Sequence, residues 1–440
     1  MNKSLIVLTI LVVISAAIVH QLHRRIYWQD VPEGLNPNST FPYRVIGFIF
    51  GVAKDLAWLG ERLGLLDSYY LGIRKCFGLT AYLTVNITFH DQLEINNTEI
   101  SGTKVRIYKP VNRNEEKTEK GEDELMPAFI YFHGGGWTIG SLDAYDIFLR
   151  RVAALSNVIV VSVAYRQAPE YIYPTSMMDC YNVAIELLNN GSQYGINVKR
   201  VMVGGDSAGG NIAAAVTHIL AGVAERHCSK QYLAGQILIY PALQMLDLNL
   251  PSYVKSKNDL IASQRDIADY VSLYLNGSTA LAAAILAGNH SRHLENTRYM
   301  AYVRPKGIPD ADDNDEDDDN KNEVIKNPEM DLSEAAAAAI IDPVASPLLA
   351  KTFRGTPQTL LITAEFDPLR DEGFLYAERI KLAGVELVHK HYFSFHGFLT
   401  LTSEPLPHPF STEEGRNGTW DVIEFLQRLK TADDLIEDLE

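Results

Sequence analysis

A chain of 440 residues with 47% hydrophobic side chains is long enough to bury a large core. Its formal net charge of −16 argues against a nucleic-acid partner, because phosphate binding requires a basic surface. The three cysteines, Cys76, Cys180 and Cys228, are too few and too widely spaced for a disulfide framework or a zinc site.

The amino-terminal segment contains an uninterrupted apolar run over residues 5–19 with basic residues on both sides. As a helix this run would span about 22 Å, less than the hydrocarbon core of about 30 Å, so it suits a signal peptide or a short membrane anchor. Small residues around Ala16 would permit cleavage, whereas Tyr27 and Trp28 stand where interfacial aromatic residues are common. We expect a retained signal-anchor over residues 1–25, with secretion after cleavage as the alternative.

Asn-x-Ser/Thr glycosylation sequons are frequent in the rest of the chain. Each is weak by itself, but seven together are typical of a chain that passes through the secretory lumen. They predict that the folded domain faces the lumen. The candidate acceptors are Asn38, Asn86, Asn96, Asn190, Asn276, Asn289 and Asn417.

Residues 26–81 precede the predicted sheet and show helical or irregular patterns. We expect them to form part of a cap over an active site. Alternatively, the amphipathic stretch 46–66 lies on the membrane surface beside the anchor.

From residue 82 onward, short apolar runs alternate with helical patterns, as in a mostly parallel sheet with helices on both faces. The eight strand candidates are YLTVNITFH, GTKVRIYKP, PAFIYFH, VIVVSVAY, RVMVGGD, GQILIYPA, QTLLITAEFD and VELVHKHYF. The helix candidates are IFLRRVAAL, MMDCYNVAIELL, GNIAAAVTHILAGV, LYAERIKLAG and WDVIEFLQRLK. These runs predict an α/β catalytic domain over residues 82–244 and 341–440.

Residues 245–340 interrupt the alternation between the sixth and seventh strands, and we expect them to form a cap insertion. Within it, residues 310–319 hold eight acidic side chains and no basic ones, which is typical of a solvated loop. A calcium site is the alternative, although the run lacks the ligand spacing and glycine of an EF-hand loop.

The sequence YFHGGGW follows the third strand candidate. Three successive glycines allow backbone N–H groups to point into a cavity, and an HGGG loop at this place supplies the oxyanion hole of lipases and esterases. We expect His133, Gly134 and Gly135 to form this motif, with Gly134, Gly135 and Ala208 as the amide donors; a flexible glycine turn is the alternative. His133 itself is expected to be structural.

The sequence VMVGGDSAGGNIAAAV places Ser207 in a GxSxG pattern between a strand and a helix. By itself the pattern is weak, and the serine could equally cap the helix. The strand–turn–helix setting favours a nucleophile elbow, in which small flanking residues expose the serine oxygen. A nucleotide-phosphate site is disfavoured because neither a Walker lysine nor GxGxxG is present.

A nucleophilic serine needs a histidine base and a carboxylate to orient it, in the chain order serine, acid, histidine. Asp367 follows the seventh strand candidate and His396 follows the eighth, so we expect these to be the acid and the base. Asp371 and Glu372 are the second and third choices for the acid, since both fall within the next helix. The remaining nearby histidines, His389 and His391, belong to the last strand and are expected to pack or face solvent.

In order and spacing, HGGGW, YRQAPE, GDSAGGN, IYPALQ, FDPLRDEG and HGF resemble the hormone-sensitive lipase group of α/β-hydrolases. Within it, the amino-terminal anchor and LDLNLPSY resemble the arylacetamide deacetylase branch, which is related to neutral cholesterol ester hydrolase. The resemblance implies Ser207 as nucleophile, Asp367 as acid and His396 as base. It also implies an endoplasmic-reticulum membrane protein, single-pass type II, with a lumenal catalytic domain.

We therefore expect a serine hydrolase that cleaves carboxylic esters, and acyl-amides as well, of small lipophilic or neutral-lipid substrates through an acyl-enzyme, without a metal or organic cofactor. A neutral-lipid or cholesteryl-ester lipase is the alternative within the same class. A catalytically silent binding module is the alternative outside it, and is disfavoured because serine, acid and histidine are all present.

Overall fold

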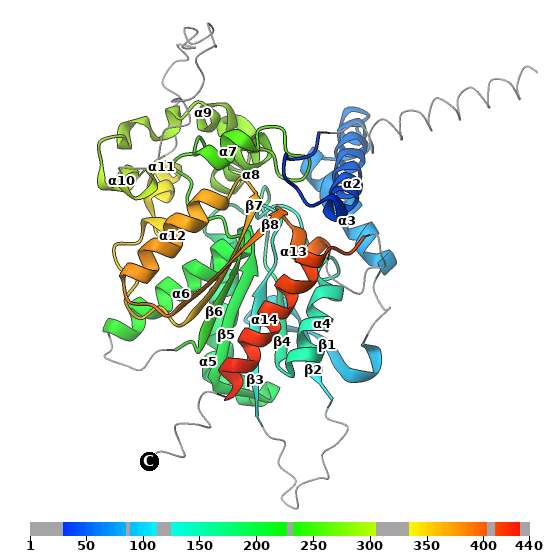
Figure 1. The fold of residues 1–440 in the computed structure, drawn as a ribbon, viewed down its shortest axis with the longest axis vertical. Helices are drawn as coiled ribbons and strands as arrows, with labels where there is room; N and C mark the ends of the chain where they lie inside the picture. Colours follow the sequence, from blue (N-terminus) through cyan, green and yellow to red (C-terminus); the bar gives the residue numbers. More distant parts are fainter. Residues whose placement is uncertain are drawn as a thin grey trace, which may run out of the picture.

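The computed structural model describes residues 30–84, 89–111, 125–226, 232–304, 334–402 and 410–431. Its centre is an eight-stranded sheet of order β1-β2-β4-β3-β5-β6-β7-β8 (Figure 1). β2 runs opposite to the other strands of this sheet, and those strands all run in one direction, so the predicted mostly parallel sheet is confirmed. The strands are β1 (Leu93–Ile100), β2 (Thr103–Pro110), β3 (Met126–Phe132), β4 (Ile159–Ala164), β5 (Ile196–Asp206), β6 (Gly235–Ile239), β7 (Thr359–Phe366) and β8 (Leu387–Phe395).

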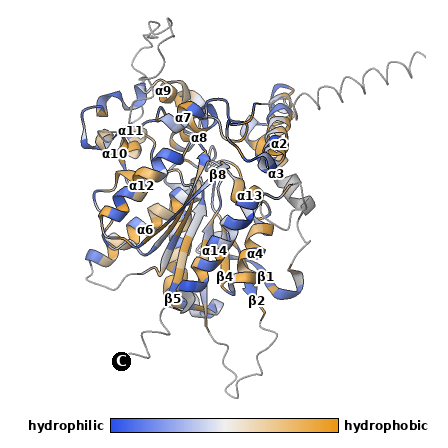
Figure 2. Cartoon of the chain, in the orientation of Figure 1, coloured by the Kyte–Doolittle hydropathy of each residue, from blue (hydrophilic) through white to orange (hydrophobic). Residues whose placement is uncertain are grey.

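Helices cover both faces of the sheet, as the alternating sequence pattern predicts. The helices α4 (Asp146–Ser156) and α14 (Glu413–Thr431) lie on one face, and α5 (Thr175–Asn190), α6 (Ala208–Arg226) and α12 (Arg370–Leu382) lie on the other (Figure 1). Because successive strand residues point to opposite faces, β3 sends Phe129 and Tyr131 into one core and Ile130 and Phe132 into the other. Figure 2 shows the hydrophobic residues of these strands and helices.

One strand prediction was wrong. The described residues of the run YLTVNITFH form no strand: α3 (Tyr69–Thr84) extends through its first three residues, and His90 begins a short 3₁₀ helix. Residues 85–88 of the run lie outside the described residues. The first strand is instead LEINNTEI, β1, which lies at the edge of the sheet and pairs with β2. An edge strand exposed on one side needs few apolar residues, so its polar sequence gave no strong strand signal.

Helices from both expected cap regions lie beyond the carboxyl ends of the parallel strands (Figure 1). The first region contributes α2 (Pro37–Arg62) and α3. Arg74 of α3 donates to the carbonyl oxygens of Thr138 and Ala168 and pairs with Glu170, which fixes this helix over the loop after β3. The second contributes α7 (Pro251–Lys255), α8 (Gln264–Asn276), α9 (Ala282–Leu286), α10 (Arg298–Val303) and α11 (Glu334–Ile341).

The expected anchor, residues 1–25, and the acidic run 310–319 lie outside the described residues, so the structure does not test either prediction. Within residues 30–431, apart from the gaps named above, no helix combines the length and apolar character needed to cross a bilayer.

Candidate active site

Each of the four segments singled out by sequence follows the carboxyl end of a parallel strand. The glycine loop begins at His133 after β3, Ser207 follows β5, Asp367 follows β7 and His396 follows β8. Since the carboxyl ends of parallel strands meet at one edge of the sheet, the fold brings these distant segments together.

Ser207 lies at a sharp turn between β5 and α6, as the elbow prediction expected. Its φ is +53°, a left-handed conformation that costs a non-glycine residue roughly 1–3 kcal/mol. The turn is possible because the flanking residues lack side chains: a Cβ on Gly205 or Gly209 would lie 2.3 or 1.9 Å from the carbonyl oxygen of Phe132. The glycines of this pattern are therefore required by close backbone packing.

The residues expected to act with Ser207 form a hydrogen-bonded chain with it. His396 Nε2 lies 3.1 Å from Ser207 Oγ, and His396 Nδ1 lies 2.8 Å from Asp367 Oδ2. The serine and histidine are each 8% exposed and the aspartate 1%, so water has little access to these contacts. This arrangement can remove the serine proton and stabilise the imidazolium that results.

The ionisation of His396 is set by two opposing effects. Burial, the largest single effect, lowers the pKa of its imidazole, but the charge and hydrogen bond of Asp367 and the charges of Asp206 and Asp259 raise it by more in total, so the net shift is upward from the usual 6.5. The histidine is thereby a stronger base than an isolated buried imidazole would be.

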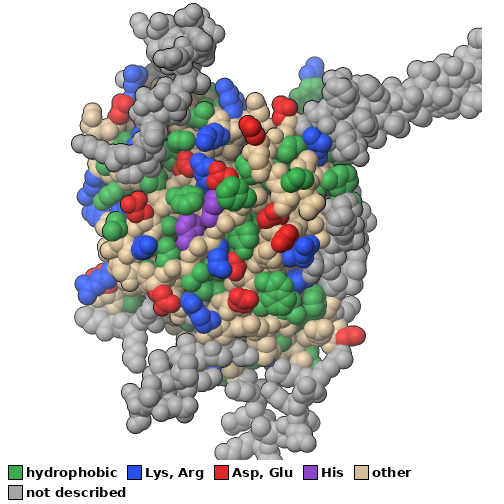
Figure 3. All heavy atoms as spheres, in the orientation of Figure 1, with side chains coloured by type: hydrophobic (Ala, Val, Ile, Leu, Met, Phe, Trp, Pro, Cys, Tyr) green, Lys and Arg blue, Asp and Glu red, His purple; other side chains and the backbone are tan. Residues whose placement is uncertain are grey.

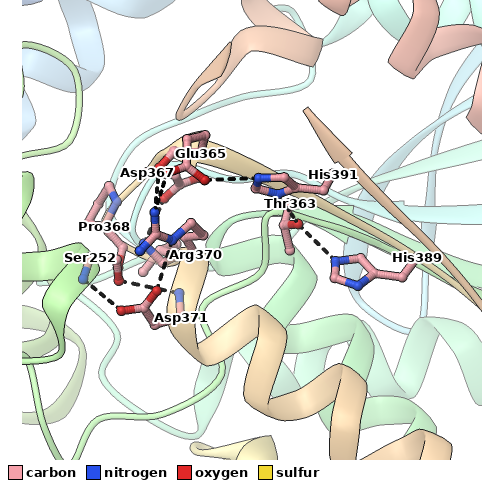
Figure 4. A network of polar contacts seen from close by, with 10 residues as sticks. Ser252, Thr363, Glu365, Asp367, Pro368, Arg370, Asp371, His389 and His391 are labelled. Atoms are coloured by element: carbon pink, nitrogen blue, oxygen red, sulfur yellow. Dashed lines mark hydrogen bonds and ion pairs between the residues drawn. The ribbon is translucent and has the colours of Figure 1, made fainter. Parts of the chain in front are cut away.

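The loop that carries Asp367 is held from both sides (Figure 4). The other carboxylate oxygen of Asp367 accepts from the Leu369 amide at 2.7 Å, and Ser252 Oγ donates to the Pro368 carbonyl at 2.7 Å. Arg370 bridges the carboxylates of Glu365 and Asp371 at 2.6 and 2.9 Å. These contacts fix the direction in which Asp367 meets the histidine.

The lower-ranked candidates take part in other contacts. Asp371 accepts from the Ser252 amide at 2.8 Å, and Glu372 accepts from the Leu243 amide at 2.7 Å. Figure 4 shows His389 and His391 on β8, where both contact the hydroxyl of Thr363. Histidine side chains also reach the surface in the view of Figure 3. In the part of the chain that the structure describes, neither His389 nor His391 forms a hydrogen bond with Ser207.

The glycine loop differs from the expectation at one donor. The amide of Gly134 donates to Asp206 Oδ1 at 2.8 Å, so it is turned into the protein wall and was wrongly expected to point into the cavity. Gly135 and Gly136 line the pocket instead, and both have positive φ values, +106° and +59°. Ala208 is the first residue of α6, where an amide has no intrahelical acceptor. The amides available for a negative charge are thus those of Gly135, Gly136 and Ala208.

Sequence reasoning missed the part played by Asp206. Its buried carboxylate accepts from the hydroxyls of Tyr131 and Tyr145 at 2.7 and 2.9 Å as well as from Gly134. Burial raises the pKa of Asp206, and these hydrogen bonds oppose part of that rise. The carboxylate links the glycine loop to the residue directly before Ser207. Its place within GDSAGG was the only available signal.

His133 is structural, as expected from the sequence. Its ring stacks on Tyr165 with centroids 4.4 Å apart, and burial lowers its pKa to about 4, so it is neutral at physiological pH. The hydroxyl of Tyr165 donates to the His133 carbonyl oxygen at 2.7 Å. Together these contacts anchor the start of the glycine loop.

A pocket of about 130 Å³ opens above Ser207 and His396. Most of its wall is apolar and comes from both cap regions as well as from the sheet end. The apolar and aromatic lining residues are Phe50, Trp137, Ile139, Ala144, Tyr145, Ala208, Ala242, Tyr253, Ile261, Ala262, Ile267, Tyr270, Val271, Leu369 and Leu401.

Comparisons with known proteins agree with this geometry. A family profile described as "alpha/beta hydrolase fold" matches residues 129–284 and 279–400. Arylacetamide deacetylase of Oryctolagus cuniculus is 36% identical over 79% of this chain and 84% of its own length. Neutral cholesterol ester hydrolase 1 of Mus musculus is 29% identical over 86% of this chain and 91% of its own length. An esterase of Pyrobaculum calidifontis is 27% identical with a TM-score of 0.56, over 85% of this chain and 98% of its own. The chain therefore belongs to the α/β-hydrolase family, in the group of ester hydrolases that includes arylacetamide deacetylase and neutral cholesterol ester hydrolase.

Proposed function

We propose that this ester hydrolase uses Ser207 as its nucleophile, His396 as its general base and Asp367 as the group that orients the base. The observation that carries the proposal is the continuous contact from Ser207 Oγ through His396 to Asp367 on the floor of the pocket. His396 Nε2 takes the serine proton while Oγ bonds to the substrate carbonyl carbon.

The negative oxygen of the tetrahedral intermediate would be bound by the amides of Gly135, Gly136 and Ala208. Such donors act in a site shielded from water, where each is worth about 3 kcal/mol of transition-state stabilisation. The protonated His396 then passes its proton to the leaving alcohol or amine, and the carbonyl–leaving-group bond breaks. A water molecule, deprotonated by the same histidine, releases the acyl group and regenerates the serine.

The pocket favours small lipophilic substrates. Its space of about 130 Å³ is close to that of an apolar cavity of about 150 Å³ that holds one benzene molecule. Esters and acyl-amides with a short acyl group or a single aromatic ring fit this space. The deacetylase among the relatives points the same way, whereas the cholesterol ester hydrolase keeps a neutral-lipid lipase as the second candidate.

Attachment to the endoplasmic-reticulum membrane through residues 1–25, with a lumenal catalytic domain, is part of the same proposal. It is supported by the apolar run 5–19 and by the sequons. In the described part of the chain the six candidate acceptors are exposed, as glycosylation requires; they are Asn38, Asn96, Asn190, Asn276, Asn289 and Asn417. Asn86 lies outside the described residues. Protease protection in sealed microsomes tests the topology.

Labelling with a serine-directed fluorophosphonate tests the nucleophile. The unsubstituted protein should be labelled and its Ser207→Ala form should not. Labelling that survives the substitution would sink the assignment, and absence of labelling in both would favour a silent binding module. Rates on p-nitrophenyl esters from acetyl to palmitoyl, beside an arylacetamide, then separate the two substrate classes: a maximum at long chains would favour the lipase.

A further inference from the structure

Helix α2 carries a second apolar face that the fold leaves outside. Its inner face packs against the protein, where Tyr43 contacts Phe395 and Ala57 is fully buried. On another side, apolar residues recur at positions 45, 49, 52, 56, 59 and 63, the spacing of a single stripe along a helix. Four members of this outer stripe are exposed: Ile49 by 40%, Leu56 by 55%, Leu59 by 45% and Leu63 by 62%.

The concentration of apolar groups here is unusual for the described surface. Six of its seventeen exposed large hydrophobic side chains lie between Ile49 and Leu65. A rotation of α2 about its axis cannot bury the stripe, because the inner face of the helix packs closely against the protein. A Cβ added at Gly47 would lie 2.6 Å from the Cβ of Leu260. A surface helix in water needs only one apolar face, so the second face indicates a binding surface.

We propose that the outer stripe of α2 rests on the lipid membrane that holds the chain; the proposal depends on the membrane attachment proposed above. The apolar run of residues 5–19 ends only 17 residues before α2 begins at Pro37, which keeps the helix near the bilayer. Charge does not oppose the contact: residues 20–84, which follow the proposed anchor on the lumenal side, carry a net charge of +2 in a chain of net charge −16.

The same helix also forms part of the active-site wall. Phe50 lines the pocket above Ser207, and its neighbour in the chain, Ile49, is exposed in the outer stripe. One helix thickness thus separates the lipid-facing surface from the pocket. A lipophilic ester dissolved in the bilayer could pass along α2 to Ser207 without crossing bulk water, so the stripe serves substrate delivery in addition to attachment.

Fluorescence quenching tests the contact directly in the full chain. A fluorophore is attached through Leu59→Cys, or through Leu382→Cys as a control, since Leu382 is 80% exposed on α12, far from α2 in Figure 1. In phosphatidylcholine–phosphatidylserine vesicles, nitroxide-labelled lipids should quench the probe at position 59 and spare the probe at 382. Equal quenching at both positions would overturn the proposal. So would energy transfer between copies labelled at position 59 without lipid quenching, which would assign the stripe to a second copy of the chain.

Kinetics test the delivery. A variant with Leu56→Gln, Leu59→Gln and Leu63→Gln should hydrolyse an ester dissolved in the vesicles about tenfold more slowly, because the apolar contact that holds α2 on the lipid is lost. Hydrolysis of a water-soluble acetyl ester should not change, and Leu382→Gln should change neither rate. Equal losses on both substrates, or no loss on either, would refute the delivery role. Ser207-dependent hydrolysis of the soluble ester reports separately on the proposed function.

Discussion

Replacing Asp367 with asparagine tests the proposed site most sharply. The carboxylate is 1% exposed and uses one oxygen for the Leu369 amide and the other for His396 Nδ1. Asparagine has only one acceptor oxygen, and the backbone amide of Leu369 can only donate, so that oxygen stays with Leu369. The side-chain NH₂ then faces Nδ1 and forces the imidazole proton onto Nε2, where it blocks proton transfer from Ser207. A wrong tautomer of this kind costs about 10⁴ in kcat, or about 5.5 kcal/mol.

The pH dependence supplies a second readout of the same change. The proposed mechanism requires neutral His396, so the rate should rise with pH through the pKa of the histidine. In the unsubstituted protein Asp367 raises that pKa; in the variant this cause is lost while burial still lowers it, so the rising limb should move to lower pH.

The assay is kcat/KM for p-nitrophenyl acetate against pH, with Asp371→Asn as the matched control. Asp371 lies four residues away but contacts Arg370 and Ser252, so its substitution should cost less than about tenfold. A kcat loss below about tenfold in the Asp367 variant would refute the reasoning, as would an unmoved pH limb or an equal loss in the control.

Other substitutions test the walls of the site. Gly135→Ala should lower kcat by about 10²–10³, because φ is +106° and the new Cβ would lie 2.2 Å from the Ile139 carbonyl oxygen; steady-state kinetics measures it. Gly209→Ala should leave little folded protein by circular dichroism, since its Cβ would lie 1.9 Å from the Phe132 carbonyl oxygen. The buried, neutral His133 has a pKa of about 4, below its unfolded value, so its stabilising contribution is lost as the pH falls from about 6.5 to 4. In the His133→Phe variant the melting temperature should therefore fall less over that pH range than it does in the unsubstituted protein.

Much of the fold, and the meeting of the three central candidate residues at one place, could be predicted from the sequence because the relevant signals are local. Buried parallel strands need continuous apolar runs, and the turns after them need glycine or a polar residue. Ser207, Asp367 and His396 each directly follow such a run, so their meeting at one sheet edge follows from topology alone.

The features that sequence reasoning missed depend on partners that are far away in the chain. Which glycine amide points into the pocket depends on Asp206, 72 residues beyond Gly134, and nothing in HGGG distinguishes the first glycine from the second. The edge strand β1 was missed for a different reason, which is the weakness of its local signal. One side of the strand is open to solvent, so its sequence needs little apolar character. Similarly, the apolar pattern of α2 does not itself tell which face packs against Phe395 and Leu260 and which stays outside.

The contacts of Asp206 give a physical reason why one turn of backbone can set both halves of the site. Asp206 and Ser207 are adjacent, and their side chains bond in different directions: the carboxylate to Gly134, Tyr131 and Tyr145, the hydroxyl to His396. The left-handed conformation at Ser207 keeps these directions apart. A shift of the turn would therefore move Ser207 Oγ and the glycine loop together. In the proposed mechanism both groups act on the same carbonyl, which accounts for the strained conformation at Ser207: a relaxed φ there would change the angle between the two side chains and separate the hydroxyl from the glycine loop.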